Sequence, residues 1–62
     1  MKEYEILVKN DANKEIAVEE LHCTVELMKK SGWQKEGSQS ITELKYEDAT
    51  MYVVSQIMKR KK

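Results

Sequence analysis

Two adjacent residues, His22 and Cys23, carry the only imidazole and the only thiol of the chain, the side chains best suited to metal binding or nucleophilic catalysis. A zinc site needs three or four such ligands. If the segment is helical, the neighbouring positions Val18, Val25 and Glu26 offer His22 one carboxylate, Glu26, and this pair would hold at most a weak surface metal. Neighbouring helical residues point about 100° apart, so Cys23 and His22 cannot form a nucleophile and its base. We expect a solvent-facing histidine, a small half-buried cysteine, and no metal or cofactor.

Acidic side chains are plentiful but scattered; among them are the pairs Glu3 and Glu5, Glu19 and Glu20, and Glu47 and Asp48. General acid–base catalysis needs two carboxyl groups that converge in a cleft with separated pKa values. A chain of 62 residues leaves little room for such a cleft. The chain has two glycines, Gly32 and Gly37, and neither begins a phosphate-binding loop. We therefore expect no enzymatic activity.

Trp33, the only tryptophan, has two plausible uses. It can stack on a base or anchor a protein partner. It can also fold back over the end of a preceding helix and cover Met28 or Leu27, which is the more frequent use of a lone tryptophan in a small domain. We expect Trp33 to belong to the core.

The chain ends in a compact basic segment, Lys59, Arg60, Lys61 and Lys62. Four adjacent cations are candidate contacts for phosphates or for an acidic partner. The whole chain, however, has a formal charge of zero and a pI near 6.6, unlike the basic balance of most nucleic-acid-binding domains. We expect residues 59–62 to be a disordered basic tail, with nucleic-acid binding possible but not favoured.

The elements that position these residues follow from hydrophobic periodicity. Alternation of Tyr4, Ile6 and Val8 predicts a strand over residues 2–9, and the polar residues 10–14 predict a loop. Val18, Leu21, Val25 and Met28 recur at helical spacing, which predicts a helix over residues 15–30 that ends before Gly32.

The second half of the chain gives a weaker pattern. Residues 34–40 are polar, residues 41–46 are weakly apolar, residues 46–50 resemble a turn, and residues 51–58 are rich in β-branched and aromatic side chains. The resulting order is β-α-β-β: a single α+β domain over residues 1–62, with one helix packed on a three-stranded, mainly antiparallel sheet.

A ribbon-helix-helix fold is the alternative. Ser40 to Glu43 fits a helix capping box, and no proline prevents a second helix over residues 41–58. Ribbon-helix-helix proteins are DNA-binding dimers of about this length, so this alternative also changes the expected function. We favour the strand, because Met51-Tyr52-Val53-Val54 is poor in helix formers.

The chain also resembles a family of short bacterial and phage domains of uncharacterised function. The resemblance lies in Tyr4 to Lys9, in the helix that ends at Gly32-Trp33, in the run from Met51 to Val54, and in the basic C-terminus. In that family an apolar strand follows Gly-Trp at once, whereas residues 34–40 intervene here. The resemblance implies the same β-α-β-β fold and no particular activity.

One helix covers one face of a three-stranded sheet, so the opposite face should need a partner. We expect Leu7, Met51, Val53 and Ile57 on that face, too apolar to remain together in water, and Tyr4 and Tyr52 on the helix side. The function expected is a non-enzymatic protein-interaction module or regulatory subunit that forms a homodimer and has an unidentified protein partner. The lone cysteine and an N-terminus unlike a secretion signal favour the cytoplasm, and no apolar run is long enough to span a membrane.

Overall fold

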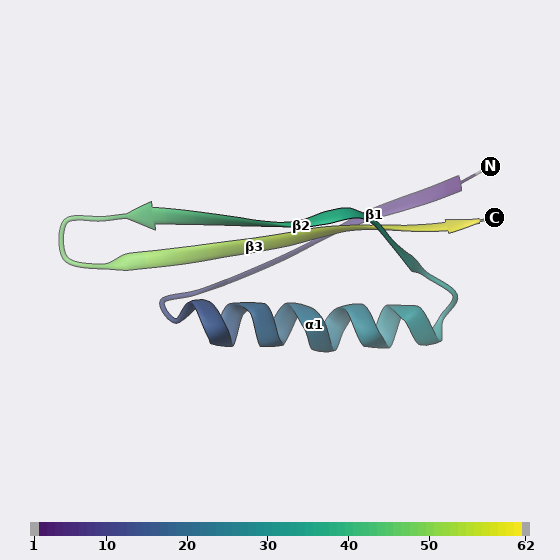
Figure 1. The fold of residues 1–62 in the computed structure, drawn as a ribbon, viewed down its shortest axis with the longest axis horizontal. Coiled ribbons are helices and arrows are strands. Elements are labelled where there is room, and N and C mark those ends of the chain that lie inside the picture. The colour runs from purple at the N-terminus through teal and green to yellow at the C-terminus, as the bar shows by residue number, and fades with distance from the viewer. Residues whose placement is uncertain (1, 62) are drawn as a thin grey trace.

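The computed structural model describes residues 2–61 and contains four elements in the order strand, helix, strand, strand (Figure 1). They are β1 (Lys2–Asp11), α1 (Lys14–Lys30), β2 (Gln34–Lys45) and β3 (Thr50–Lys61). The α+β class and the β-α-β-β order are confirmed. The ribbon-helix-helix alternative is wrong, because residues 41–58 form the hairpin of β2 and β3 and contain no helix.

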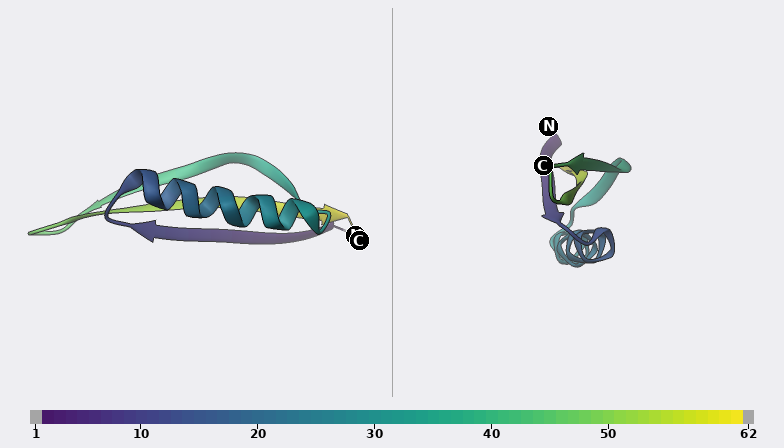
Figure 2. Two further views of the ribbon diagram at one scale, coloured as in Figure 1. Left: turned by 90° about the horizontal axis from the view of Figure 1, so that it is seen from below. Right: turned by 90° about the vertical axis from the view of Figure 1, so that its left-hand side faces the viewer.

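The strands form one sheet in the order β1-β3-β2, with β3 in the middle and antiparallel to both neighbours. Pairing of β1 with β3 begins at Lys2 and Lys61, so the start of β1 and the end of β3 lie at the same end of the sheet. The helix lies along one side of this sheet (Figure 2). We call the sheet surface that faces α1 the inner face and the opposite surface the outer face.

Local side-chain contacts explain where α1 begins and ends. The Asn13 side-chain oxygen accepts hydrogen bonds from the backbone N–H groups of Glu15 (2.9 Å) and Ile16 (3.3 Å), which have no partner inside the helix. Lys29 and Lys30 lie in the last turn, where the helix dipole favours cations. Gly32 then adopts a φ of 91°, a conformation available mainly to glycine.

The core forms between α1 and the two strands β1 and β3. Its fully buried side chains are Ala17, Leu21, Val25, Val54 and Met58, and Leu7, Val18, Met28 and Trp33 pack against them. Trp33 is half-buried and packs against this cluster, as expected. Leu27 takes no part, since 64% of its surface is exposed.

Strand β2 begins directly after Gly32-Trp33 and includes the polar residues 34–40, which do not show the pattern of a strand. The polar residues from Gln34 onward are paired with β3, but the register shifts between Glu36 and Ser40. This irregularity contains Gly37, whose φ is 76°. A bulge of this kind breaks the alternation of side chains along the strand, and the sequence pattern over residues 34–40 therefore does not look like a strand.

Gln56, on the inner face of β3, holds this bulge in place. Its side chain is only 2% exposed, and its amide nitrogen donates to the carbonyl oxygens of Gly37 (3.2 Å), Ile57 (3.1 Å) and, more weakly, Glu36 (3.4 Å). Buried polar groups stabilise a fold only when they are hydrogen-bonded. Gln56 thus supplies partners for backbone carbonyls at the bulge.

The expectation of a disordered basic tail is wrong for Lys59, Arg60 and Lys61, which continue β3 and pair with the first residues of β1. Lys62 lies outside the described residues. Over residues 2–61, no helix has the length and hydrophobicity required to cross a bilayer.

Candidate interaction surface

Strand register determines which side chains lie on each face, because paired residues of antiparallel strands point to the same side of the sheet. Leu7 pairs with the buried Gln56 and packs against the core, so it lies on the inner face. Ile6 pairs with Ile57 and lies on the outer face. The placement of Leu7 opposite the helix is therefore wrong.

Tyr4 is also placed differently from the expectation. It pairs with Lys59, one step from Ile6 and Ile57 along the same face, and 57% of its surface is exposed. Tyr52 lies on the inner side of β3 as expected, since it has the same parity as Val54. Met51, Val53 and Ile57 lie on the outer face, as expected.

The outer face carries a row of apolar side chains that no other part of residues 2–61 covers. Ile6, Tyr4, Val8, Ile57 and Leu44 are 64%, 57%, 52%, 43% and 40% exposed, respectively. Val53 and Met51 are half-buried and lie beside them on β3. We call this set the outer apolar row: Tyr4, Ile6, Val8, Leu44, Met51, Val53 and Ile57. Large contiguous apolar patches are uncommon on monomers and mark interaction sites.

One end of the molecule is a projecting hairpin. The β2–β3 turn extends past the first turn of α1 and past the end of β1 (Figures 1 and 2). It is closed by a hydrogen bond from the Tyr46 N–H to the Ala49 carbonyl (2.7 Å) and carries Glu47 and Asp48. Tyr46 is 61% exposed there. A hairpin of two strands alone is only marginally stable in water. A contact with another surface would therefore stabilise this projecting hairpin.

The opposite end of the outer face is cationic. Lys2 pairs with Lys61, and Lys59 follows on the same side of β3. The Lys59 Nζ lies 2.6 Å from a Glu36 carboxylate oxygen. The hydrogen bond and the attraction to Lys59 lower the pKa of the Glu36 carboxyl, and Lys2 contributes a smaller attraction. The same contact raises the pKa of Lys59.

Arg60 lies on the inner side of this cationic end. Its Nη2 and Nε donate to the same Glu3 carboxylate oxygen at 2.7 and 3.1 Å, and its guanidinium carbon lies 4.7 Å from the centre of the Trp33 ring. A cation over a tryptophan face is attracted by the ring. Part of the basic segment is therefore neutralised within the same chain, by Glu3 and by Glu36.

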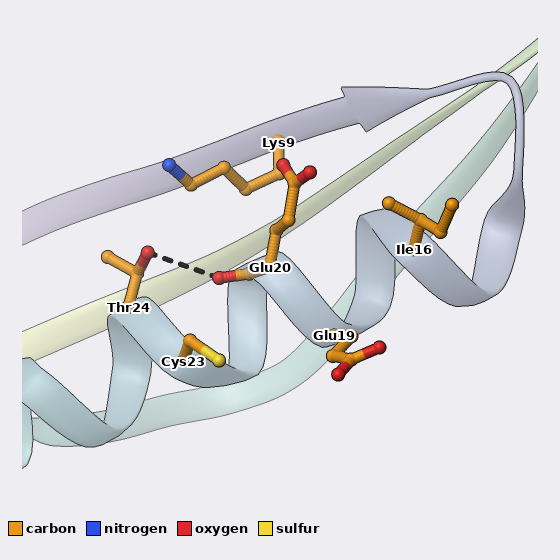
Figure 3. A pocket seen from close by; sticks show the side chains of 6 residues that line it. All are labelled: Lys9, Ile16, Glu19, Glu20, Cys23 and Thr24. Atoms are coloured by element: carbon orange, nitrogen blue, oxygen red, sulfur yellow. Dashed lines mark hydrogen bonds between the residues drawn. The ribbon is translucent and has the colours of Figure 1, made fainter.

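The residues first considered for catalysis are not brought together. A shallow concavity of about 490 Å³ lies beside α1, lined by Lys9, Ile16, Glu19, Glu20, Cys23 and Thr24. In Figure 3 the Glu20 side chain points toward Lys9 whereas Glu19 points away, so the two carboxylates do not converge. The Thr24 hydroxyl donates to the Glu20 carbonyl oxygen at 3.2 Å.

His22 and Cys23 both lie on the exposed side of α1. The His22 Nε2 is 3.9 Å from a Glu26 carboxylate oxygen, to which Lys29 also donates (3.4 Å). Cys23 is exposed, and the expectation of a half-buried thiol is wrong. Among residues 2–61, no three His, Cys, Asp or Glu side chains are grouped closely enough to hold a metal ion.

The outer apolar row is therefore the most distinctive surface of the described residues, with the cationic end beside it. Its geometry suits contact with another surface rather than a chemical reaction. Comparison with models of protein families, with curated proteins and with solved structures found no significant match for this chain.

Proposed function

We propose that the protein is a small, non-enzymatic interaction module that forms a homodimer through the outer apolar row. The observation that carries this proposal is the exposure of Ile6, Val8 and Ile57 on a sheet face without a covering layer. Sheet domains normally bury such a face against a second layer of structure. A second copy supplies that layer with a self-complementary surface.

The size of the face fits a dimer. The molecule is 45 Å long and 13 to 18 Å across, so a flat side covers roughly 600 to 800 Å². Each partner of a standard interface hides about 800 Å². The row lies mainly on β1 and on β3, the middle strand, and Ser55 provides a small side chain between Val53 and Ile57 where two copies can approach closely.

Charge determines how the two copies are oriented. Lys2, Lys59 and Lys61 gather at one end of the outer face, and Glu47 and Asp48 lie in the turn at the other end. A two-fold axis parallel to the strands would place the lysines of both copies together, which is repulsive. An axis perpendicular to the strands separates them and brings each acidic turn toward the lysine end of the other copy.

Two further features support a binding role in the cytoplasm. The carboxylates beside α1 diverge, and the Thr24 hydroxyl is engaged by the backbone, which argues against catalysis. The exposed Cys23 thiol has no second cysteine in the chain to pair with, and a reducing compartment keeps such a thiol free.

Sedimentation equilibrium of the wild-type chain and two variants tests the dimer. Ile6→Lys places a charge in the outer apolar row, and Leu27→Lys places one on α1 at a residue with the same 64% exposure. Burial of an unpaired charge costs about 3 kcal/mol or more, so Ile6→Lys should weaken dimerisation by at least about a hundredfold. The Leu27→Lys variant should remain a dimer like the wild type.

A wild-type chain that is monomeric at tens of micromolar would refute the homodimer. A dimer that Ile6→Lys leaves intact would show that another surface is used. Circular dichroism of both variants confirms folding, because residues this exposed in the monomer contribute little to its stability.

A further inference from the structure

A second concave surface lies at the cationic end of the sheet, where β1 begins, β3 ends and the chain leaves α1. Its volume is about 340 Å³, within the usual range for a small-molecule site. It is lined by Lys2, Gly32, Gln34, Lys59, Arg60 and Lys61. Four of these six residues are cationic and none is acidic, so the lining is complementary to an anion.

Lys2 and Lys61 are the least compensated of these cations. They are directly opposite each other in the pairing of β1 with β3, and like charges in this arrangement destabilise a sheet. No carboxylate of residues 2–61 lies within ion-pair distance of either lysine. An anion held between their ammonium groups would remove this repulsion.

Arg60 and Lys59 are held in position by carboxylates that do not line the cavity. Glu3 and the Trp33 ring fix the Arg60 guanidinium, and Glu36 fixes the Lys59 ammonium. These contacts use only some of the available N–H donors of each side chain. Cations that are already ordered lose less conformational entropy when an anion binds.

We propose that this cavity, the terminal cation pocket, binds a small anion that carries a diphosphate group. Two linked phosphates offer enough acceptor oxygens for Lys2, Lys59 and Lys61, which lie on the same face of the sheet, in charge-assisted hydrogen bonds. The Gln34 amide adds a neutral donor. A nucleic-acid backbone would need an extended cationic groove, whereas the charge here is confined to one end of a chain with no net charge.

Calorimetric titration with inorganic pyrophosphate, at constant ionic strength set by chloride, tests the pocket. The double variant Lys2→Gln/Lys61→Gln should bind pyrophosphate at least about tenfold more weakly than the wild type, because it loses two charge-assisted contacts. The control Lys14→Gln/Lys45→Gln removes the same charge from exposed residues outside the pocket and should bind like the wild type.

Thermal melting provides a second measurement. Without pyrophosphate, Lys2→Gln/Lys61→Gln should melt at the same temperature as the wild type or higher, because the repulsion is removed. With pyrophosphate, the wild type should gain more stability than the variant. In the proposed dimer the acidic turn of the second copy lies toward this pocket, so the titration is repeated with the Ile6→Lys variant to separate the two proposals.

Three results would overturn the proposal. The first is no detectable binding of pyrophosphate at millimolar concentration. The second is equal weakening by both double variants, which indicates general charge screening rather than a site. The third is tighter binding of a short oligothymidine than of pyrophosphate, which would assign the pocket to a nucleic-acid backbone instead of a small molecule.

Discussion

Gln56 shows how a single polar residue stabilises the irregular part of this sheet. Gln56→Leu keeps a similar volume but removes the donor to the Gly37, Ile57 and Glu36 carbonyls. Leaving these groups without a partner should lower the free energy of unfolding by about 1 to 3 kcal/mol, measured by urea denaturation. Gln39→Leu, an exposed position in the same bulge, should change it by less than about 0.5 kcal/mol. Equal stability of the two variants would contradict this role.

The Glu36–Lys59 contact makes stability depend on pH at both extremes. The pKa of Glu36 is lowered from 4.5, so its contribution is present above that pH and is lost as the pH falls through the lowered pKa. The pKa of Lys59 is raised from 10.5, so the same contribution is lost as the pH rises through the raised value.

Glu36→Gln should therefore flatten the acid side of the stability profile, measured as the urea midpoint between pH 2 and pH 6. Glu19→Gln removes the same charge from an exposed position on α1, away from Lys59, and serves as the control. A Glu36→Gln protein that loses stability in acid as steeply as the Glu19→Gln protein would show that the contact with Lys59 does not contribute.

At the scale of the element, α1 depends on its cap. Asn13→Ala leaves the N–H groups of Glu15 and Ile16 without their side-chain acceptor and should cost about 1 kcal/mol of stability. Asn13→Asp retains the acceptor and adds a charge that the helix dipole favours, so it should match or exceed the wild type. Thermal melting followed by circular dichroism distinguishes them, and equal melting of all three proteins would contradict the cap.

The elements differ in how far the sequence could predict them. Helix α1 was predictable from its apolar spacing and its flanking polar and glycine residues, because those signals are local. The first half of β2 was not, since the bulge at Gly37 and the long-range bonds from Gln56 replace the alternation that identifies a strand. The end of β3 was missed because Lys59, Arg60 and Lys61 look like a solvated tail, although they pair with β1.

At the scale of the molecule, the sequence pattern does not determine which face of β1 packs against α1. Four of the five residues 4–8 of β1 are apolar, so both faces look able to pack on a helix. The position of α1 determines which face of β1 is buried: the helix covers Leu7 and leaves Ile6 exposed. That choice depends on tertiary packing, which a strand pattern does not contain.

Because α1 packs against the Leu7 face of β1, the larger apolar set of this strand is left uncovered, namely Tyr4, Ile6 and Val8. A chain of this length has a small core of its own, and residues 2–61 contain five fully buried apolar side chains. A second copy on the outer face would enlarge that core, so stability and dimerisation should be linked. The melting temperature should accordingly rise with protein concentration for the wild type and stay constant for Ile6→Lys.

The most direct test of the dimer is an isotope-filtered NMR experiment on a mixture of labelled and unlabelled chains, which detects contacts only between copies. We predict contacts between the methyl groups of Ile6, Val53 and Ile57 in one copy and outer-face side chains of the other. The Leu27 and Ile16 methyl groups on α1 should give none. Contacts from these helix residues, or no contacts between copies at concentrations well above micromolar, would contradict dimerisation through the outer apolar row.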